Sequence, residues 1–304
     1  GTMTLSYYSN NSEGDLYYTL DGTEPTKENG TLYTEPIQIV RNLTVKAVAW
    51  KEKHFYSEVS SYNVTNVSRT FFVDNVWYRL TDDSQADEVE VTNGNVAYEG
   101  DVNIPATVTI QGTKYDVVGI GKSALYDQDK VTSITLPASI RYIGERAFYD
   151  ADKLQTIDVP EKVKSIGNYA FYNCDVLTTV ILHEGIETIG EHAFYSMPAL
   201  KTIVIPSTVT SIGNGAFASC SSLTSATLPA GLKNIPDELF RSDRQLADIT
   251  LPTAPETIGQ YAFSETAITT MQLPATVTQM GEGVFNTCRQ LTNMVIPEGI
   301  TELD

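Results

Sequence analysis

The sequence predicts an α+β repeat protein: a right-handed solenoid of eight 22–23-residue repeats, preceded by a small all-β sandwich and a β-rich cap. Three observations lead to this prediction. A short motif returns at a fixed interval from residue 119 onward, an apolar strand pattern precedes each copy, and the first 65 residues alternate between strand and turn patterns. We therefore divide the chain into residues 1–65, 66–118 and 119–304.

The segments that precede the repeats are rich in strand patterns. In residues 1–65, DLYYTLDGTEPT predicts a strand with Leu16, Tyr18 and Leu20 facing inward, followed by an Asp-Gly turn, and LTVKAVAW predicts another strand. In residues 66–118, two short alternating runs also predict strands. We expect this second segment to cover the open end of the first repeat, because an uncovered edge strand exposes unpaired N–H and C=O groups.

The repeated motif is Ile-Gly followed, after two variable residues, by Ala-Phe. The first residue of the motif is Ile143, Ile166, Ile189, Ile212 and Ile258 in the close copies. In the weaker copies it is Ile120, Ile235 and Met280. Successive copies lie 23 residues apart, except for one 22-residue step before Met280. A constant interval of this length is typical of a solenoid whose coils stack on one another.

Each repeat combines a strand pattern with a helical pattern. In the segment LQTIDVP, Ile157 and Val159 are two positions apart, as on one face of a strand, and Pro160 ends that strand. The I-G-x-x-A-F segment has apolar residues at helical spacing, so we expect a single helical or 3₁₀ turn there. One strand and one short helix in about 20–29 residues is typical of a leucine-rich-repeat solenoid.

These motifs resemble those of known families. The L-x-x-I-x-L-P and I-G-x-x-A-F motifs make residues 119–304 similar to the BspA-like (Treponema pallidum-type) leucine-rich repeats of bacterial surface proteins, and residues 66–118 resemble the β-rich lead-in of such arrays. The signature Y-Y-T-x-D-G-T-x-P-T resembles the chitobiase/β-hexosaminidase C-terminal, Fn3-associated type of module, of which we expect the first strand to be missing. The repeat resemblance implies an extracellular or cell-surface location and a role in adhesion.

The net charge of −18 and the hydropathy pattern exclude several partners. Nucleic acids and anionic membrane surfaces repel such a chain, since their affinity depends on Lys and Arg that neutralise phosphates. No run of about 18 apolar residues is present to insert into a bilayer. The opening GTMTLSYYSN lacks the charged and apolar regions of a signal peptide. We expect a monomer.

The three cysteines are predicted to be free, buried packing residues. Cys174, Cys220 and Cys288 occupy the same position in different repeats, and two coils separate the first two by about 10 Å at a strand spacing of about 4.8 Å. A disulfide tolerates Cα separations of up to about 7 Å, so these residues cannot pair. Other repeats carry Ala151, Met197 and Asp243 in this position, which argues against a row of metal ligands.

No catalytic or metal-binding constellation is apparent elsewhere. His183 and His192 lie on different sides of one coil, and His54 belongs to another domain, so neither a Ser-His-Asp nor a Cys-His set can be assembled. The acidic stretch Asp82-Asp83 with Asp87-Glu88 does not have EF-hand spacing and reads as a solvated loop. The sequence therefore predicts no enzyme activity, no metal and no cofactor.

The remaining candidate site is the surface formed by the repeated strands. The residues that flank each central strand residue alternate outward and form the concave sheet of a solenoid. The candidate ligand-binding residues are Thr156, Asp158, Thr179, Ile181, Thr202, Val204, Asp248 and Thr250. Two interpretations stay open. In the first, the strands form a plain sheet face, since Thr favours exposed strands. In the second, they form an extended binding groove, an interpretation favoured by the outward apolar residues Ile181, Val204 and Val295.

The sequence thus predicts a non-catalytic protein that binds a protein or glycan through its solenoid. The alternative is carbohydrate recognition by residues 1–65 in a glycan-utilisation system. After Pro297 a ninth copy begins, with Ile300 and Leu303 in its apolar positions, and the sequence stops before the Ala-Phe turn. Because an uncapped coil exposes apolar side chains and strand edges, we expect further repeats or a cap beyond residue 304, or alternatively pairing of the exposed end with another molecule.

Overall fold

The computed structural model describes residues 2–6, 14–39, 43–51, 57–65, 69–81 and 87–300. Internal contacts divide the chain into two units, residues 1–71 with 109–113 and residues 72–108 with 114–304. The sequence predictions that concern His54, Asp82, Asp83 and Leu303 lie outside the described residues.

The N-terminal unit is a small antiparallel arrangement of two sheets. Its strands are β1 (Thr2–Met3), β2 (Asp15–Thr19), β3 (Thr31–Leu32), β4 (Ile37–Gln38), β5 (Leu43–Trp50) and β6 (Ser60–Val64). One sheet has the order β3-β2-β5-β6, and β1 pairs with β4. Ile37, Ile39 and Val45 form the buried core, against which Tyr18 packs. Leu16, Tyr18 and Leu20 were predicted to face inward, but Tyr17 and Thr19 are the buried side chains of β2, Leu16 and Tyr18 are half-buried, and Leu20 beyond the strand is exposed.

The described residues of the segment before the repeats form six strands. These are β7 (Thr70–Val73), β8 (Val76–Leu80), β9 (Glu88–Val91), β10 (Gly100–Asn103), β11 (Thr107–Ile110) and β12 (Thr113–Ile120). β10 pairs in parallel with β13 (Val131–Thr135), and β12 pairs in parallel with both β9 and β14 (Tyr142–Ile143). β8 then pairs antiparallel with β9. The lead-in strands thus occupy the strand edges of the first coil.

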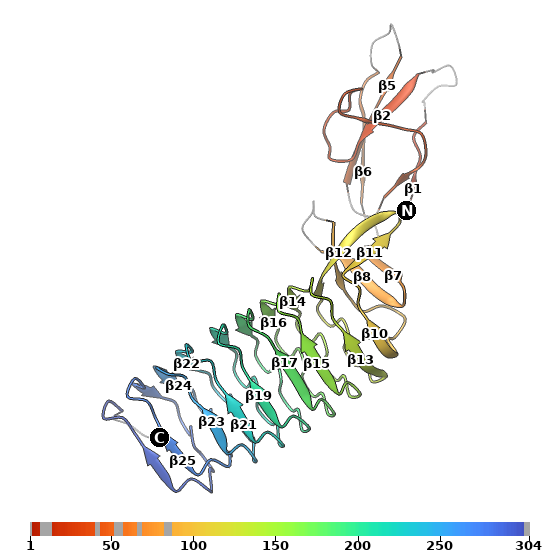
Figure 1. The fold of residues 1–304 in the computed structure, drawn as a ribbon. Coiled ribbons are helices and arrows are strands. Elements are labelled where there is room, and N and C mark those ends of the chain that lie inside the picture. The colour runs from red at the N-terminus through yellow and green to blue at the C-terminus, as the bar shows by residue number, and fades with distance from the viewer. Residues whose placement is uncertain are drawn as a thin grey trace. The chain divides into compact units, whose positions relative to one another are not determined.

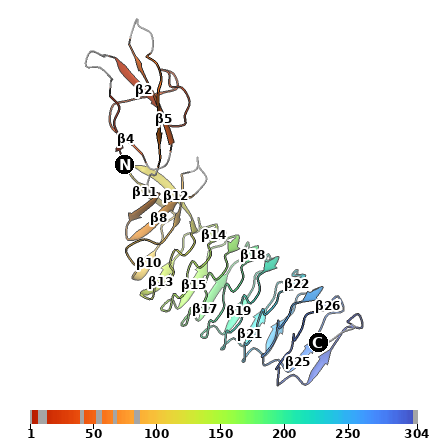
Figure 2. The ribbon, with the colours of Figure 1, turned by 180° about the vertical axis from the view of Figure 1, so that it is seen from behind.

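The repeats build two rows of parallel strands, which Figure 1 and Figure 2 show from opposite sides. The row of longer strands continues from β13 as β15 (Thr156–Val159), β17 (Thr179–Leu182), β19 (Thr202–Val204), β21 (Ser225–Thr227), β23 (Asp248–Thr250), β25 (Thr270–Gln272) and β27 (Asn293–Val295). The row of short strands continues from β14 as β16 (Ser165–Ile166), β18 (Thr188–Ile189), β20 (Ser211–Ile212), β22 (Asn234–Ile235), β24 (Thr257–Ile258) and β26 (Gln279–Met280).

The prediction of an α+β fold is wrong: the described chain contains no helix, and the protein is an all-β solenoid of about eight coils. Each I-G-x-x-A-F segment is a run of turns. The second variable residue and the second residue after Phe have positive φ in each coil, as at Arg146 (φ 54°) and Asp150 (φ 55°). A left-handed residue at every fourth position cannot continue a right-handed helix.

Hydrogen bonds between coils explain why the turns are preferred over a helix. The N–H groups of Arg146 and Phe148 donate to the carbonyl groups of Asn168 and Ala170 in the next coil (2.9 and 2.7 Å), whereas the intervening Ala147 N–H closes a turn within its own coil (3.3 Å). In a helix all these groups would bond within the coil and none would connect neighbours. The apolar spacing that resembles a helix arises because Ile143, Ala147 and Phe148 all point into the core.

The solenoid core is a column of stacked aromatic rings. The Phe of the repeated motif lies on the equivalent Phe of the next coil from Phe148 to Phe285, and the ring centroids of Phe171 are 4.9 Å from Phe148 and 5.2 Å from Phe194. The motif glycine allows this spacing. A Cβ on Gly190 would lie 2.5 Å from the backbone N of Asn168, so a side chain there would force the coils apart.

Candidate functional site

The eight predicted binding residues all lie on one exposed face of the longer strands. Thr156 and Asp158 of β15 pair with Thr179 and Ile181 of β17. Between them Ile157 points inward and is buried, because successive side chains of a strand point to opposite faces. The predicted alternation is therefore found in the structure, and we name the outward positions of β13 to β27 the outer strand face.

The predicted residues form two groups on this face. Thr202 and Val204 of β19 lie beside β17, which completes a group on three successive coils. Asp248 and Thr250 of β23 lie two coils beyond β19, and Ser225 and Thr227 of β21 pair with both strands. All eight predicted side chains are exposed. The structure thus brings six of the predicted residues together and connects the other two through β21.

The centre of the outer strand face is apolar. The exposed fractions of Ile181 and Val204 are 44% and 68%, which is high for side chains of their size, and Val295 near the last described coil is 51% exposed. Beside Ile181, the His183 Nε2 atom lies 2.7 Å from Oδ1 of Asp158. The histidine stands where other repeats have the proline that ends the strand. An apolar centre with a polar border is therefore present.

The cysteine thiols do not form a chemical site. Cys174 and Cys220 are buried, Cys288 is half-buried, and all three are free. Each Sγ–H donates to the carbonyl of a Phe in the preceding coil, as Cys174 does to Phe148 at 3.2 Å. Burial raises the pKa of the Cys174 thiol to about 12, which disfavours the reactive thiolate. Within the described part of the chain, no group of three His, Cys, Asp or Glu residues is placed to hold a metal ion.

A second row of aromatic rings lies on the turn side of the solenoid and was not predicted. Tyr126, Tyr149, Tyr172 and Tyr195 each follow the core Leu or Phe, and their rings stack with centroid separations of 4.7 to 5.0 Å. Burial raises the pKa of Tyr149 and Tyr172. Because the rings cover one another's faces, the row presents mainly ring edges to solvent and stabilises the stacking of four coils. The recurrence of Tyr at one repeat position was the signal for it.

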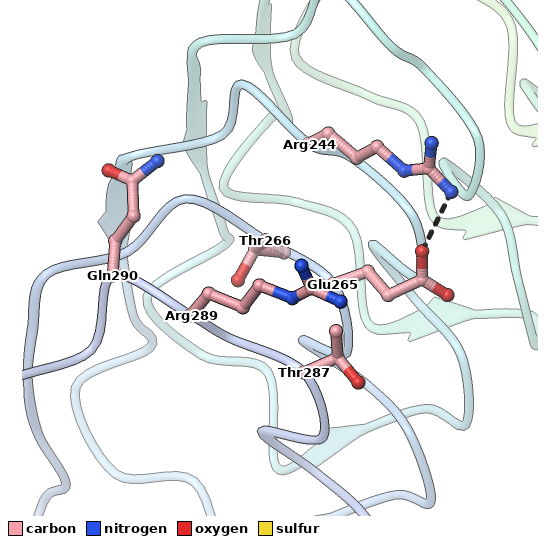
Figure 3. Close-up of a pocket in the computed structure, with 6 residues that line it drawn as sticks. All are labelled: Arg244, Glu265, Thr266, Thr287, Arg289 and Gln290. Atoms are coloured by element: carbon pink, nitrogen blue, oxygen red, sulfur yellow. Dashed lines mark hydrogen bonds and ion pairs between the residues drawn. The ribbon is translucent and has the colours of Figure 1, made fainter.

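A pocket of about 370 Å³ opens near the end of the solenoid, and Figure 3 shows its lining. The lining residues are Arg244, Glu265, Thr266, Thr287, Arg289 and Gln290. A guanidinium N–H of Arg244 donates to Oε2 of Glu265 at 2.9 Å. None of these residues was predicted as a site residue. The available signal was the single 22-residue step before Met280, which lies in this part of the chain.

A further hollow of about 550 Å³ extends across the short strands β16, β18 and β20. It is lined by hydroxyl and amide side chains and by the motif glycines, among them Ser165, Asn168, Thr188 and Ser211. The Asn168 side chain already accepts the Glu191 N–H at 2.9 Å, so part of this polar surface serves contacts between coils.

Comparisons with known proteins agree with this architecture. A family model of the BspA type leucine rich repeat region matches residues 118–246 and 210–304, in six copies, and a model of the Fn3 associated region matches residues 3–64. No curated protein matches the chain. No helix in the described residues has the length and apolar character needed to cross a membrane.

Three solved structures are similar to the chain. A leucine-rich repeat protein from Bacteroides ovatus is 32% identical, with a TM-score of 0.60, over 77% of this chain and 66% of that chain. The leucine-rich repeat protein of T. pallidum is 30% identical, with a TM-score of 0.56, over 71% and 87%. A leucine rich cell surface protein from Faecalibacterium prausnitzii is 26% identical, with a TM-score of 0.56, over 75% and 55%. This chain thus spans less than two thirds of the first and third proteins.

Proposed function

We propose, because the chain belongs to the BspA-type leucine-rich repeat family, that it is a non-catalytic cell-surface or secreted protein that binds a macromolecule through the outer strand face. The observation that carries this proposal is the exposure of Ile181 and Val204 on the neighbouring strands β17 and β19 of the outer strand face. Neighbouring exposed apolar side chains with a polar rim favour an interaction surface over a solvated one.

The strand face suits a rigid partner surface. One parallel ladder holds β15 and β17 and another holds β19, β21 and β23, and the side chains beneath them, such as Ile157 and Ile203, are buried. A preformed surface loses little conformational entropy on binding, so less of the interaction energy is spent on ordering it. The apolar centre favours a protein ligand, whereas the surrounding hydroxyl groups of Thr179 and Thr202 supply hydrogen bonds at the border. We propose adhesion to a host or neighbouring-cell protein as the role of this face.

The proposal is tested with the full chain and a double substitution on the strand face, Ile181→Lys with Val204→Lys. Binding to a panel of purified extracellular glycoproteins and to a glycan array is measured by surface plasmon resonance and fluorescence. The matched control is Val96→Lys, an exposed apolar position between β9 and β10. We expect the double variant to lose the interaction and the control to retain it.

Two results would contradict the strand face as the binding site. One is an interaction of unchanged affinity in the double variant. The other is a glycan signal that survives the double substitution and disappears when residues 1–65 are removed. That second result would favour carbohydrate recognition by the N-terminal module, the alternative function predicted from the sequence.

A further inference from the structure

The pocket near the end of the solenoid arises where one repeat is a residue shorter than its neighbours. Six positions separate Phe240 from Leu246 and Phe285 from Leu291, but five separate Phe263 from Ile268. The missing residue belongs to the corner of the coil, the short segment between the turns and the next strand. The two neighbouring coils have an Arg-Gln pair in this segment, which begins at Arg244 in one and at Arg289 in the other. The shortened corner at 265–267 therefore leaves a space between the adjacent corners, and residues of all three corners line the pocket.

Arg289 is an exception among the arginines of the repeats. The other repeat arginines in the described chain each lie within ion-pair distance of a glutamate, namely Arg141 with Glu88, Arg146 with Glu145, Arg241 with Glu238, and Arg244 with Glu265. Arg289 has no carboxylate of a described residue within that distance. In a chain of net charge −18, the exposed Arg289 guanidinium is thus left without a carboxylate partner of its own and can receive an anionic ligand.

The polar groups of the pocket are complementary to an anion that also carries hydroxyl groups. The Arg289 guanidinium offers only donors, in the planar fork that fits a carboxylate. Glu265 binds Arg244 through Oε2, which leaves Oε1 as an acceptor. Thr287 gives its hydroxyl proton to Oδ1 of Asn286 at 2.8 Å, so its oxygen lone pairs remain available as acceptors. In the view of Figure 3 the Arg289 side chain projects between Thr266 and Thr287, and the Glu265 carboxylate points to Arg244.

We propose that this pocket binds an acidic sugar unit of a glycan, with the sugar carboxylate on Arg289 and sugar hydroxyl groups on Glu265 and Thr287. A volume of about 370 Å³ lies at the lower end of the range for small-molecule sites, about 300–1,000 Å³, and therefore suits one sugar ring rather than a longer segment. The site is separate from the outer strand face and does not depend on the function proposed for it.

The test uses the full chain and saturation-transfer NMR with sodium glucuronate as the probe. Glucose, which lacks the carboxylate, and N-acetylglycine, which lacks the hydroxyl groups, are the matched compounds. We expect glucuronate to bind about tenfold or more tightly than either, since one charge-assisted contact contributes about 1.5–3 kcal/mol. Arg289→Gln is expected to remove the advantage of glucuronate over glucose, because only the carboxylate contacts Arg289. The control Arg241→Gln, an exposed arginine paired outside the pocket, is expected to preserve it.

Each other outcome contradicts the proposal. Absence of saturation transfer to glucuronate, equal binding of glucose, or an unchanged affinity in Arg289→Gln would show that the pocket does not recognise an acidic sugar. Equal binding of N-acetylglycine would show that the pocket recognises a carboxylate alone, such as a peptide C-terminus, and not a sugar. If the Gln variant does not fold, Arg289→Lys takes its place, because it keeps the charge and loses the fork. Unchanged glucuronate affinity in that variant would also contradict the bidentate contact.

Discussion

The backbone N–H of Cys220 donates a hydrogen bond of 2.7 Å to Oδ1 of Asp243, a carboxyl group that is fully buried one coil further along the solenoid. The other carboxyl oxygen, Oδ2, has no hydrogen-bond partner. Cys174, Met197, Cys220 and Thr266 occupy this position in neighbouring repeats, so the core is built for a small or neutral side chain there. Burial raises the pKa of Asp243 well above its ordinary value, against the smaller opposing effect of the Cys220 N–H.

The first prediction concerns the pH dependence of stability at Asp243. The Asp243 carboxyl group stays protonated in the folded state at pH values where it has lost its proton in the unfolded state, in which an Asp has a pKa of about 3.9. Stability therefore falls as pH rises above that value, by at most about 1.4 kcal/mol per pH unit for one proton. Asp243→Asn removes this contribution to the pH dependence of stability. The free energy of unfolding of the variant minus that of the wild type should therefore increase as pH rises. Urea unfolding at a series of pH values measures it.

A control for this prediction is Asp248→Asn, since Asp248 is exposed on the outer strand face. Its effect on the free energy of unfolding should be small, because the side chain is in solvent in both the folded and the unfolded state. A difference between Asp243→Asn and wild type that stays constant from acid to neutral pH would mean that Asp243 ionises normally in the folded protein.

The second prediction compares the core and the strand face. Phe171→Ala removes a fully buried ring from the middle of the aromatic column and should cost about 3–5 kcal/mol of the free energy of unfolding. Thr179→Ala on the outer strand face should cost well under about 1 kcal/mol. Urea unfolding followed by circular dichroism measures both. Similar losses at the two positions would refute the assignment of inward and outward side chains.

The third prediction concerns the close contact between coils at the motif glycine. Gly190→Ala places a Cβ 2.5 Å from backbone atoms of Asn168 and Gly167, which cannot move without separating two coils. We expect a loss of about 1–3 kcal/mol or more in the free energy of unfolding. Gly231→Ala is the matched control, because a Cβ there meets no atom within 4 Å. If both substitutions have the same effect on thermal unfolding, the glycine spacing does not limit the approach of the coils.

The fourth prediction concerns the thiols. Under native conditions at mildly alkaline pH, iodoacetamide should leave Cys174 and Cys220 unmodified, because both are buried and burial raises the pKa of each. The half-buried Cys288 should react faster. After denaturation without a reducing agent, mass spectrometry should find three labels. Fewer than three would reveal a disulfide and contradict the spacing of the coils.

Much of the repeat architecture follows from the sequence, for a specific reason. The 23-residue interval places Phe148, Phe171 and Phe194 on top of one another, and a stack of identical coils allows few other arrangements of a continuous core. The same regularity separates Cys174 from Cys220 by two coils, and alternation along β15 and β17 places Thr156 and Thr179 outward. The sequence alone likewise reveals the family motifs in the N-terminal module and in the repeats.

The tertiary structure decided what depends on contacts between coils. The apolar spacing of Ile143, Ala147 and Phe148 is compatible with a helix, and only the hydrogen bonds to the next coil show that turns replace it. The sequence carries one residue fewer in this coil, and only the structure shows that a pocket lined by Thr266 and Arg289 lies at the shortened corner. The sequence by itself determined which residues repeat and which face they share. The stacked backbone decided how each coil satisfies its polar groups, because those partners lie about 22 residues away in the chain.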